Sequence, residues 1–257
     1  MLIKNQISNQ LTFKDGRFYT DENGNYFPSA TTLLEAYPKP AQLIMWMKEV
    51  GSKADEIRDA AGKRGSSVHQ LTEDYDNGIE CTLLDEYGKP RYSLEEWSMF
   101  ERYVEFSVTH KPEHLLVEQT FINSSLGFAG TIDRVCIIDG KTYVLDIKTS
   151  NGIYNSYWLQ LAAYKELYED ALSSWTGHQV VRNENMPSID GVAILWLNAK
   201  TRTAGKKGDV QGKGWQMVSE FDTSKQWSLF QAVQQLWHAE HEGDKPKEFS
   251  YQLSHKK

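Results

Sequence analysis

Hydrophobic and polar positions alternate in the first part of the chain and then follow helical spacing. Over residues 12–28, Phe and Tyr alternate with polar residues around Asp15-Gly16 and Asn23-Gly24, which are dipeptides favoured in tight turns. This pattern predicts an N-terminal hairpin. Apolar residues then recur every three to four positions, as on one face of a helix. They predict helices over 29–35, 41–50, 52–77 and 94–108, the third of which runs through or breaks at Gly62 and Gly65.

At the start of the second half of the chain, apolar and polar residues alternate with the two-residue period of β-strands. Its pattern predicts strands at 115–122, 127–138, 141–148, 191–197 and 215–221, and helices at 154–172 and 224–241. Because the strand at 191–197 is apolar on both alternating faces, we expect it inside a sheet with helices on both sides. The order of elements predicts a single α/β domain, a mixed central β-sheet flanked by helices. We expect the N-terminal hairpin and helical segment (about 1–110) to pack on a core of about 111–245.

The hairpin over 127–148 has a register that follows from its turn. If Asp139-Gly140 is a two-residue turn, Ile138 faces Lys141 and opposing residue numbers sum to 279. Asp133 then faces Asp146, with Cβ atoms about 4.5 to 5.5 Å apart. Lys148, two residues beyond Asp146, points to the same side of the sheet.

Two facing carboxylates need a compensating charge. At about 4 Å they repel by roughly 4 kcal/mol at an effective dielectric constant near 20. A divalent cation would compensate fully and Lys148 only in part, so a charged hairpin rim without a metal stays open as an alternative. Glu118 adds a third carboxylate: if the preceding turn spans 123–126, Glu118 faces Thr131, the neighbour of Asp133 on the same face.

Five short segments resemble motifs of the PD-(D/E)XK nuclease superfamily, in particular the clade of the RecB nuclease domain and the mitochondrial genome-maintenance exonuclease. They are Phe27-Pro-Ser-Ala-Thr-Thr-Leu-Leu, Gly65-Ser-Ser-Val-His69, Gly130-Thr-Ile-Asp133, Asp146-Ile147-Lys148 and Gln160-Leu-Ala-Ala-Tyr164. Each motif is short, but the five occur in the order typical of the clade. The residue before Asp133 is Ile132, where the superfamily's nominal pattern has Pro, as is common in this clade.

The resemblance implies a restriction-endonuclease-like core and metal-dependent cleavage of phosphodiesters. It implies that Mg²⁺ or Mn²⁺ is held by His69, Asp133, Asp146 and the backbone carbonyl of Ile147. The chemistry is consistent, because hard Mg²⁺ prefers oxygen ligands and a metal polarises the phosphate and lowers the pKa of bound water. The four-cysteine iron-sulfur cluster of some relatives is excluded, because the chain has two cysteines.

The resemblance also assigns roles outside the metal shell. Lys148 would orient or help to deprotonate the attacking water. Gln160 and Tyr164, four residues apart and so on one helix face, would position metal, water or a phosphate. Glu118 joins this catalytic set through its expected place beside Asp133. Taken alone, Gln160 and Tyr164 are equally consistent with a polar pair on a packed helix, and a lone helical histidine is more often packed than ligating.

Charge and composition limit where nucleic acid could bind. The net charge is -7, so a basic surface must be local. Residues 200–213 carry five basic side chains and one Asp, a local charge of +4. This segment predicts a phosphate-tracking loop with Lys200, Arg202, Lys206 and Lys207, or alternatively a solvated tip, in which case Arg64 and its neighbours would contact DNA. No apolar run approaches the roughly 20 residues of a membrane span, and no leader pattern opens the chain, so we expect a cytoplasmic location.

These features together predict a Mg²⁺-dependent DNA nuclease. The clade favours an exonuclease that processes DNA ends or single strands, with replication or recombination proteins as partners. A structure-specific endonuclease is the alternative within the same class. A catalytically silent nucleic-acid-binding module is the alternative from another class, although such a module would gain nothing from a repulsive pair of carboxylates.

Overall fold

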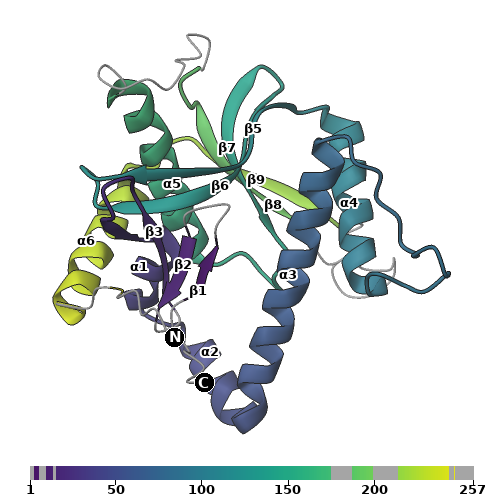
Figure 1. Ribbon diagram of the computed structural model, residues 1–257, viewed down its shortest axis with the longest axis horizontal. Coiled ribbons are helices and arrows are strands. Elements are labelled where there is room, and N and C mark those ends of the chain that lie inside the picture. The colour runs from purple at the N-terminus through teal and green to yellow at the C-terminus, as the bar shows by residue number, and fades with distance from the viewer. Residues whose placement is uncertain are drawn as a thin grey trace, which may run out of the picture.

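The computed structural model describes residues 3–5, 10–13, 16–174, 187–198, 214–242 and 246, with only the backbone of 3–5 and 172–174. Two β-sheets and their helices make up the described residues (Figure 1). Among these residues, no helix combines the length and the apolar character that crossing a membrane requires.

The N-terminal hairpin is part of a four-stranded antiparallel sheet. Its strands follow chain order as β1 (Ile3–Asn5), β2 (Gln10–Phe13), β3 (Gly16–Thr20) and β4 (Tyr26–Pro28). Ser29 then caps the short helix α1 (Ala30–Leu33) by accepting a hydrogen bond from the Thr32 N–H, and a 3-10 turn, η1 (Leu34–Ala36), follows. Leu11 and Phe18 of this sheet are buried in one cluster with Leu161 and Phe230 of the later helices, so the N-terminal segment packs on the rest of the molecule.

The second sheet has five strands in chain order and is mixed, as the sequence predicted. They are β5 (Glu113–Asn123), β6 (Phe128–Ile138), β7 (Lys141–Lys148), β8 (Gly191–Trp196) and β9 (Gln216–Glu220). All neighbours are antiparallel except β7 and β8, which run parallel. Because parallel neighbours need a crossover, the helix α5 (Asn155–Ser174) lies between β7 and β8 in the chain.

Helices cover both faces of the five-stranded sheet (Figure 1). The helices α5 and α6 (Ser224–Glu240) lie on one face, and α3 (Ala54–Asp76) and α4 (Leu94–His110) on the other. Strand β8 shows both contacts, since Val192 and Ile194 join the cluster on the α5 side and Ala193 and Leu195 the cluster on the α3 side. The prediction of a strand covered on both sides is confirmed.

Helix α3 follows α2 (Ala41–Val50) and a 3-10 turn, η2 (Gly51–Lys53). It is continuous over 23 residues, so Gly62 and Gly65 do not break it. Neither glycine has a positive φ, and a glycine inside a helix costs about 1 kcal/mol relative to alanine without forcing a break. Because α3 is continuous, its second half, which carries His69, packs against the five-stranded sheet.

Candidate metal centre

The β6–β7 hairpin brings Asp133 and Asp146 to one end of the five-stranded sheet. Opposing residue numbers sum to 279 along its ladder, as in the last pair, Arg134 and Leu145, so the register predicted from the turn is confirmed. The backbone pairing ends there, one residue short of Asp133 and Asp146. The Ile147 N–H donates a hydrogen bond of 2.8 Å to Asp133 Oδ2, which joins the strands at that point. Both aspartates are buried, with exposed fractions of 7% and 1%.

Helix α3 adds His69 to the first of these aspartates. His69 Nδ1 lies 3.4 Å from Asp133 Oδ2 and 3.7 Å from Glu118 Oε1. Its other ring nitrogen, Nε2, lies 2.9 Å from the carbonyl oxygen of Ile147. Ligand atoms of His69, Glu118 and Asp133 all lie within 4.8 Å of one another. Three segments distant in sequence therefore converge on one point, and we call these three residues with the Ile147 carbonyl the cation group.

Glu118 reaches the cation group through a register that differs from the expected one. Thr131 pairs with Thr120, and the flanking pairs set Glu118 opposite Asp133. The expected position opposite Thr131 is therefore wrong. The reason lies in the β5–β6 turn, which includes Gly127 with a φ of +77° and shifts the register by two residues. The corrected register brings the Glu118 carboxylate closer to Asp133.

Asp146 lies beside the cation group and is engaged by a lysine and a glutamine. Lys148 Nζ lies 2.6 Å from Asp146 Oδ2 and donates to Gln160 Oε1 at 3.2 Å. Gln160 Nε2 donates to Asp146 Oδ1 at 3.3 Å and to the Tyr164 hydroxyl at 3.0 Å. The predicted residues Asp146, Lys148, Gln160 and Tyr164 thus form one buried polar chain from β7 to α5.

Tyr157 is a further member of this chain that the sequence analysis missed. Lys148 Nζ lies over the Tyr157 ring, 4.7 Å from its centroid. A cation over an aromatic face is attracted by the ring quadrupole, so Tyr157 helps to fix the ammonium group. The spacing could have revealed it, because Tyr157 precedes Gln160 by three residues and so shares its helix face.

The carboxylates of the cation group hold a proton on His69. Burial lowers the pKa of His69, but the charge of Asp133 and the contacts of Glu118 outweigh burial and raise this pKa to about 9. Without a bound cation, His69 is therefore protonated at neutral pH. A cation that uses a ring nitrogen must displace this proton.

Lys148 keeps its proton although it is buried. Burial lowers the pKa of Lys148, but the charges of Asp146 and Asp133 outweigh it, and the pKa lies above its ordinary value. Burial also raises the pKa of Asp146, while the Lys148 charge opposes that rise. A lysine that is cationic at neutral pH suits orienting a water or offsetting negative charge better than abstracting a proton.

The donor atoms of the cation group fit a hard divalent cation. They are carboxylate and carbonyl oxygens with one imidazole nitrogen, and no thiolate is among them. The 2.9 Å between His69 Nε2 and the Ile147 oxygen is the length of a hydrogen bond, whereas His69 Nδ1 faces the two carboxylates. A cation bound by both the ring and the Ile147 carbonyl would have to replace this hydrogen bond. The donors alone do not select Mg²⁺ over Mn²⁺.

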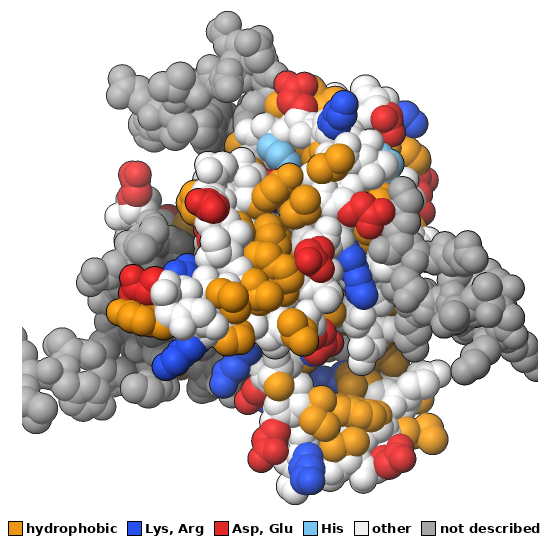
Figure 2. All heavy atoms as spheres, turned by 90° about the vertical axis from the view of Figure 1, so that its right-hand side faces the viewer, with side chains coloured by type: hydrophobic (Ala, Val, Ile, Leu, Met, Phe, Trp, Pro, Cys, Tyr) orange, Lys and Arg blue, Asp and Glu red, His pale blue; other side chains and the backbone are white. Residues whose placement is uncertain are grey.

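Of the residues predicted to contact nucleic acid, the structure describes one. Lys200, Arg202, Lys206 and Lys207 lie outside the described residues, so their role stays a prediction. Arg64 on α3 makes an ion pair with Glu95 on α4, at 3.4 Å between Nη1 and Oε2. Figure 2 shows the α3–α4 face, where acidic and basic side chains are interspersed around a stripe of apolar ones. This face is not a concentrated basic surface.

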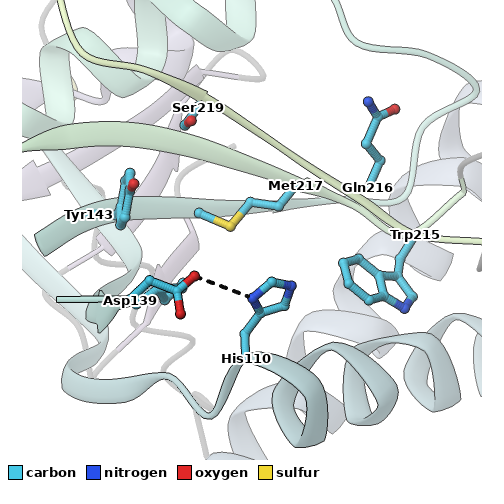
Figure 3. Close-up of a pocket in the computed structure, with 8 residues that line it drawn as sticks. His110, Asp139, Tyr143, Trp215, Gln216, Met217 and Ser219 are labelled. Atoms are coloured by element: carbon cyan, nitrogen blue, oxygen red, sulfur yellow. Dashed lines mark ion pairs between the residues drawn. The ribbon is translucent and has the colours of Figure 1, made fainter. Parts of the chain in front are cut away.

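A separate groove lies on the α4 side, away from the cation group. It has a volume of about 380 Å³ and is lined by the β6–β7 turn, the end of α4 and strand β9. Figure 3 shows His110, Asp139, Tyr143, Trp215 and Met217 around it, with His110 Nδ1 3.9 Å from Asp139 Oδ2. Among the residues that line it there is no member of the predicted site, so the sequence motifs do not concern this groove.

Searches with protein-family models and among curated proteins return no match to this chain. The geometry of the site and the sequence motifs therefore carry the functional argument.

Proposed function

We propose that the protein is a Mg²⁺-dependent deoxyribonuclease with a restriction-endonuclease-like core, which acts as an exonuclease on DNA ends or single strands. The observation that carries the proposal is the cation group next to the buried pair of Asp146 and Lys148. A cation position beside a protonated lysine supplies the two positive charges that can stabilise the charge developing on a phosphodiester during hydrolysis. DNA as the partner and a cytoplasmic location belong to the proposal on the sequence arguments above.

His69, Glu118, Asp133 and the Ile147 carbonyl would hold the metal, and Asp146 would complete its shell directly or through water. A bound Mg²⁺ would polarise the phosphate and lower the pKa of a bound water. The chain's own contribution is to place a positive charge at a fixed point. Asp146, Gln160 and Tyr157 all contact Lys148 Nζ, and a remaining N–H group could orient the water and stabilise the charge that develops on phosphate oxygens.

The sheet supports the proposed core because it gathers motifs that are far apart in the chain. Four of the five segments that resemble the clade meet around Asp133: the α3 motif at His69, the β6 and β7 motifs, and the α5 motif. The fifth, which begins in β4 and continues into α1, lies close by, because Ser29 forms a β-bridge with Ala129 of β6. A set of unrelated short matches would have no reason to converge in space.

A cleavage assay tests this proposal. End-labelled single-stranded and duplex DNA are incubated with the chelator-treated protein, with and without added Mg²⁺, and products are resolved over time. Cleavage is expected only with Mg²⁺. Asp133→Asn and Lys148→Ala are expected to leave less than a tenth of wild-type turnover, which corresponds to an increase of more than about 1.4 kcal/mol in the activation barrier. Matched controls are Asp139→Asn, at an exposed turn, and Lys225→Ala, on the exposed start of α6.

The products separate the alternatives. Mononucleotides released in steps support an exonuclease, whereas discrete internal fragments favour a structure-specific endonuclease. Binding of DNA without cleavage at any Mg²⁺ concentration would favour a silent binding module and overturn the proposal. Equal turnover in Lys148→Ala and Lys225→Ala would remove Lys148 from the mechanism.

A further inference from the structure

Arg134 is the largest fully buried side chain among the described residues, and it lies directly behind the cation group. Each of the three guanidinium nitrogens donates at least one hydrogen bond. Nε donates to Asp76 Oδ2 at 2.6 Å, Nη1 to the Asp133 carbonyl at 2.6 Å and to Glu118 Oε1 at 3.3 Å, and Nη2 to Thr72 Oγ1 at 3.2 Å. A buried guanidinium costs several kcal/mol unless it is paired in this way, so its presence calls for a reason beyond packing.

Asp76 forms an ion pair with Arg134. The two side chains are exposed by 2% and 0%, and burial alone would raise the pKa of Asp76. His114 and Arg134 outweigh burial and keep the pKa of Asp76 below its ordinary value, so Asp76 is ionised. The pair of Asp76 and Arg134 is therefore close to neutral overall. Arg134 can hold a further carboxylate without strongly repelling a cation bound nearby.

Glu118 is the carboxylate that Arg134 holds. Its Oε1 has two described ion partners, Arg134 Nη1 at 3.3 Å and His69 Nδ1 at 3.7 Å. The Glu118 side chain is 23% exposed, and its backbone has a φ of +48°. Repulsion from Asp133 would favour a rotamer that turns the Glu118 carboxylate into solvent. The contact from Arg134 Nη1 opposes that rotation and keeps the carboxylate at the cation group.

The same guanidinium also fixes the turn of α3 that carries His69. Thr72 accepts a hydrogen bond from Arg134 Nη2 and donates one to the His69 carbonyl at 2.8 Å. Asp76 lies one turn further along α3. Arg134 on β6 thus connects to both flanks of the cation group, α3 on one side and β5 on the other.

We propose that Arg134, paired with Asp76, is a positioning residue for the cation group, which orients the Glu118 carboxylate. This inference rests on the metal-dependent function proposed above. Partners that orient metal ligands typically change metal affinity by 10-fold to 100-fold when they are removed. A residue that only stabilised the fold would lower the melting temperature and leave the affinity of the folded protein unchanged.

Mn²⁺ binding, measured by electron paramagnetic resonance of the free ion and without DNA, tests this role. Arg134→Met is expected to weaken Mn²⁺ binding about 10-fold to 100-fold. Arg134→Lys keeps the positive charge but lacks the guanidinium donors, so this variant is expected to bind Mn²⁺ with intermediate affinity. If Arg134→Met does not fold, Arg134→Lys provides the test. Phe230→Leu, which trims a buried ring on α6, is the stability control and is expected to keep wild-type affinity at a lower melting temperature.

A double mutant identifies the route. If Arg134 acts through Glu118, Glu118→Gln already removes the benefit, and adding Arg134→Met to it is expected to weaken Mn²⁺ binding less than about twofold further. Wild-type affinity in both folded Arg134 variants, or full multiplication of the two losses, would overturn the positioning role. Wild-type protein that binds no Mn²⁺ would overturn both this role and the proposed function. Mn²⁺ binding with these losses but without DNA cleavage would overturn only the function.

Discussion

Gly130 is a glycine because the ring of Tyr164 occupies the space of a side chain. A Cβ at this position would lie 2.5 Å from Tyr164 Cε1, a distance that requires one of the two elements to move. The Tyr164 hydroxyl accepts a hydrogen bond from Gln160, so a displaced ring would also disturb the polar chain that ends at Lys148. The glycine at the start of the β6 motif thus acts on the site through helix packing.

Gly130→Ala is expected to lower the free energy of unfolding by about 1 to 3 kcal/mol, the usual cost of overpacking a closed site. Gly62→Ala is the matched control, since Gly62 lies inside α3 with nothing within 4 Å of an added Cβ. The control is expected to raise stability by about 0.5 to 1 kcal/mol through helix propensity. Urea unfolding of both variants measures the difference, and equal shifts would contradict the steric argument.

His69 gives the metal-free protein a stability that depends on pH. Its pKa is raised from 6.5 to about 9 in the folded state, because Asp133 and Glu118 outweigh burial. A raised pKa adds stability that is complete below the unfolded-state value and is lost as the pH rises through the folded-state value. In chelator, the stability advantage of wild type over His69→Gln is therefore expected to shrink between about pH 6.5 and pH 9. Urea unfolding across this range measures it, and a constant advantage would show that His69 does not carry the proton.

At the scale of single elements, α5 presents one polar face to the end of β7. Tyr157, Gln160 and Tyr164 are spaced by three and four residues, so they lie on one side of the helix. Lys148 Nζ lies over the Tyr157 ring and donates a hydrogen bond to Gln160 Oε1, while Gln160 Nε2 donates to Asp146. The helix therefore controls the direction of the ammonium group as well as its depth.

Tyr157→Leu is expected to lower kcat about tenfold with little change in KM, because the ring fixes Lys148 rather than the substrate. Loss of a cation–π contact of about 1 to 2 kcal/mol gives this range. Tyr157→Phe keeps the ring and is expected to stay within about threefold of wild type. Steady-state kinetics on labelled DNA at saturating Mg²⁺ decide it; equal losses in both variants would assign the effect to the hydroxyl instead.

The hairpin elements show what a sequence can and cannot predict. The Asp139-Gly140 turn fixed the β6–β7 register correctly, because a two-residue turn leaves one pairing. The β5–β6 register failed, because a longer turn admits several pairings and Glu118 adopts a left-handed φ that no pattern signals. Ile132 and Val135 lie in the same core cluster although they are three apart, so alternation along β6 slips near Asp133. Such slips depend on tertiary packing, which periodicity cannot report.

At the scale of the whole molecule, the two sheets act as one support for the site. The Tyr19 hydroxyl of β3 lies 3.0 Å from Thr131 Oγ1 of β6, and Thr131 Oγ1 lies 2.8 Å from Thr120 Oγ1 of β5. Residues of both sheets also share one buried cluster. Binding at the cation group is therefore expected to stabilise the molecule as a unit.

Mn²⁺ is expected to raise the melting temperature of the chelator-treated wild type and not that of Asp133→Asn. Ligand at 100 times its dissociation constant adds about 2.7 kcal/mol to the free energy of unfolding. Asp139→Asn, at the exposed turn, is expected to respond as wild type does. Differential scanning calorimetry with and without Mn²⁺ measures the shift. A similar shift in Asp133→Asn would place the cation elsewhere.

The contact between His69 and the Ile147 carbonyl joins residues 78 positions apart, and this separation has a kinetic consequence. Closing so long a loop costs entropy, and the ligand atoms of the cation group come together only when α3 packs on the sheet. In the unfolded chain the ligand atoms of the cation group are far apart, so they cannot bind one ion together. A bound cation would therefore leave the folding rate nearly unchanged and slow unfolding. Its effect would be to make the folded protein kinetically more stable rather than to speed folding.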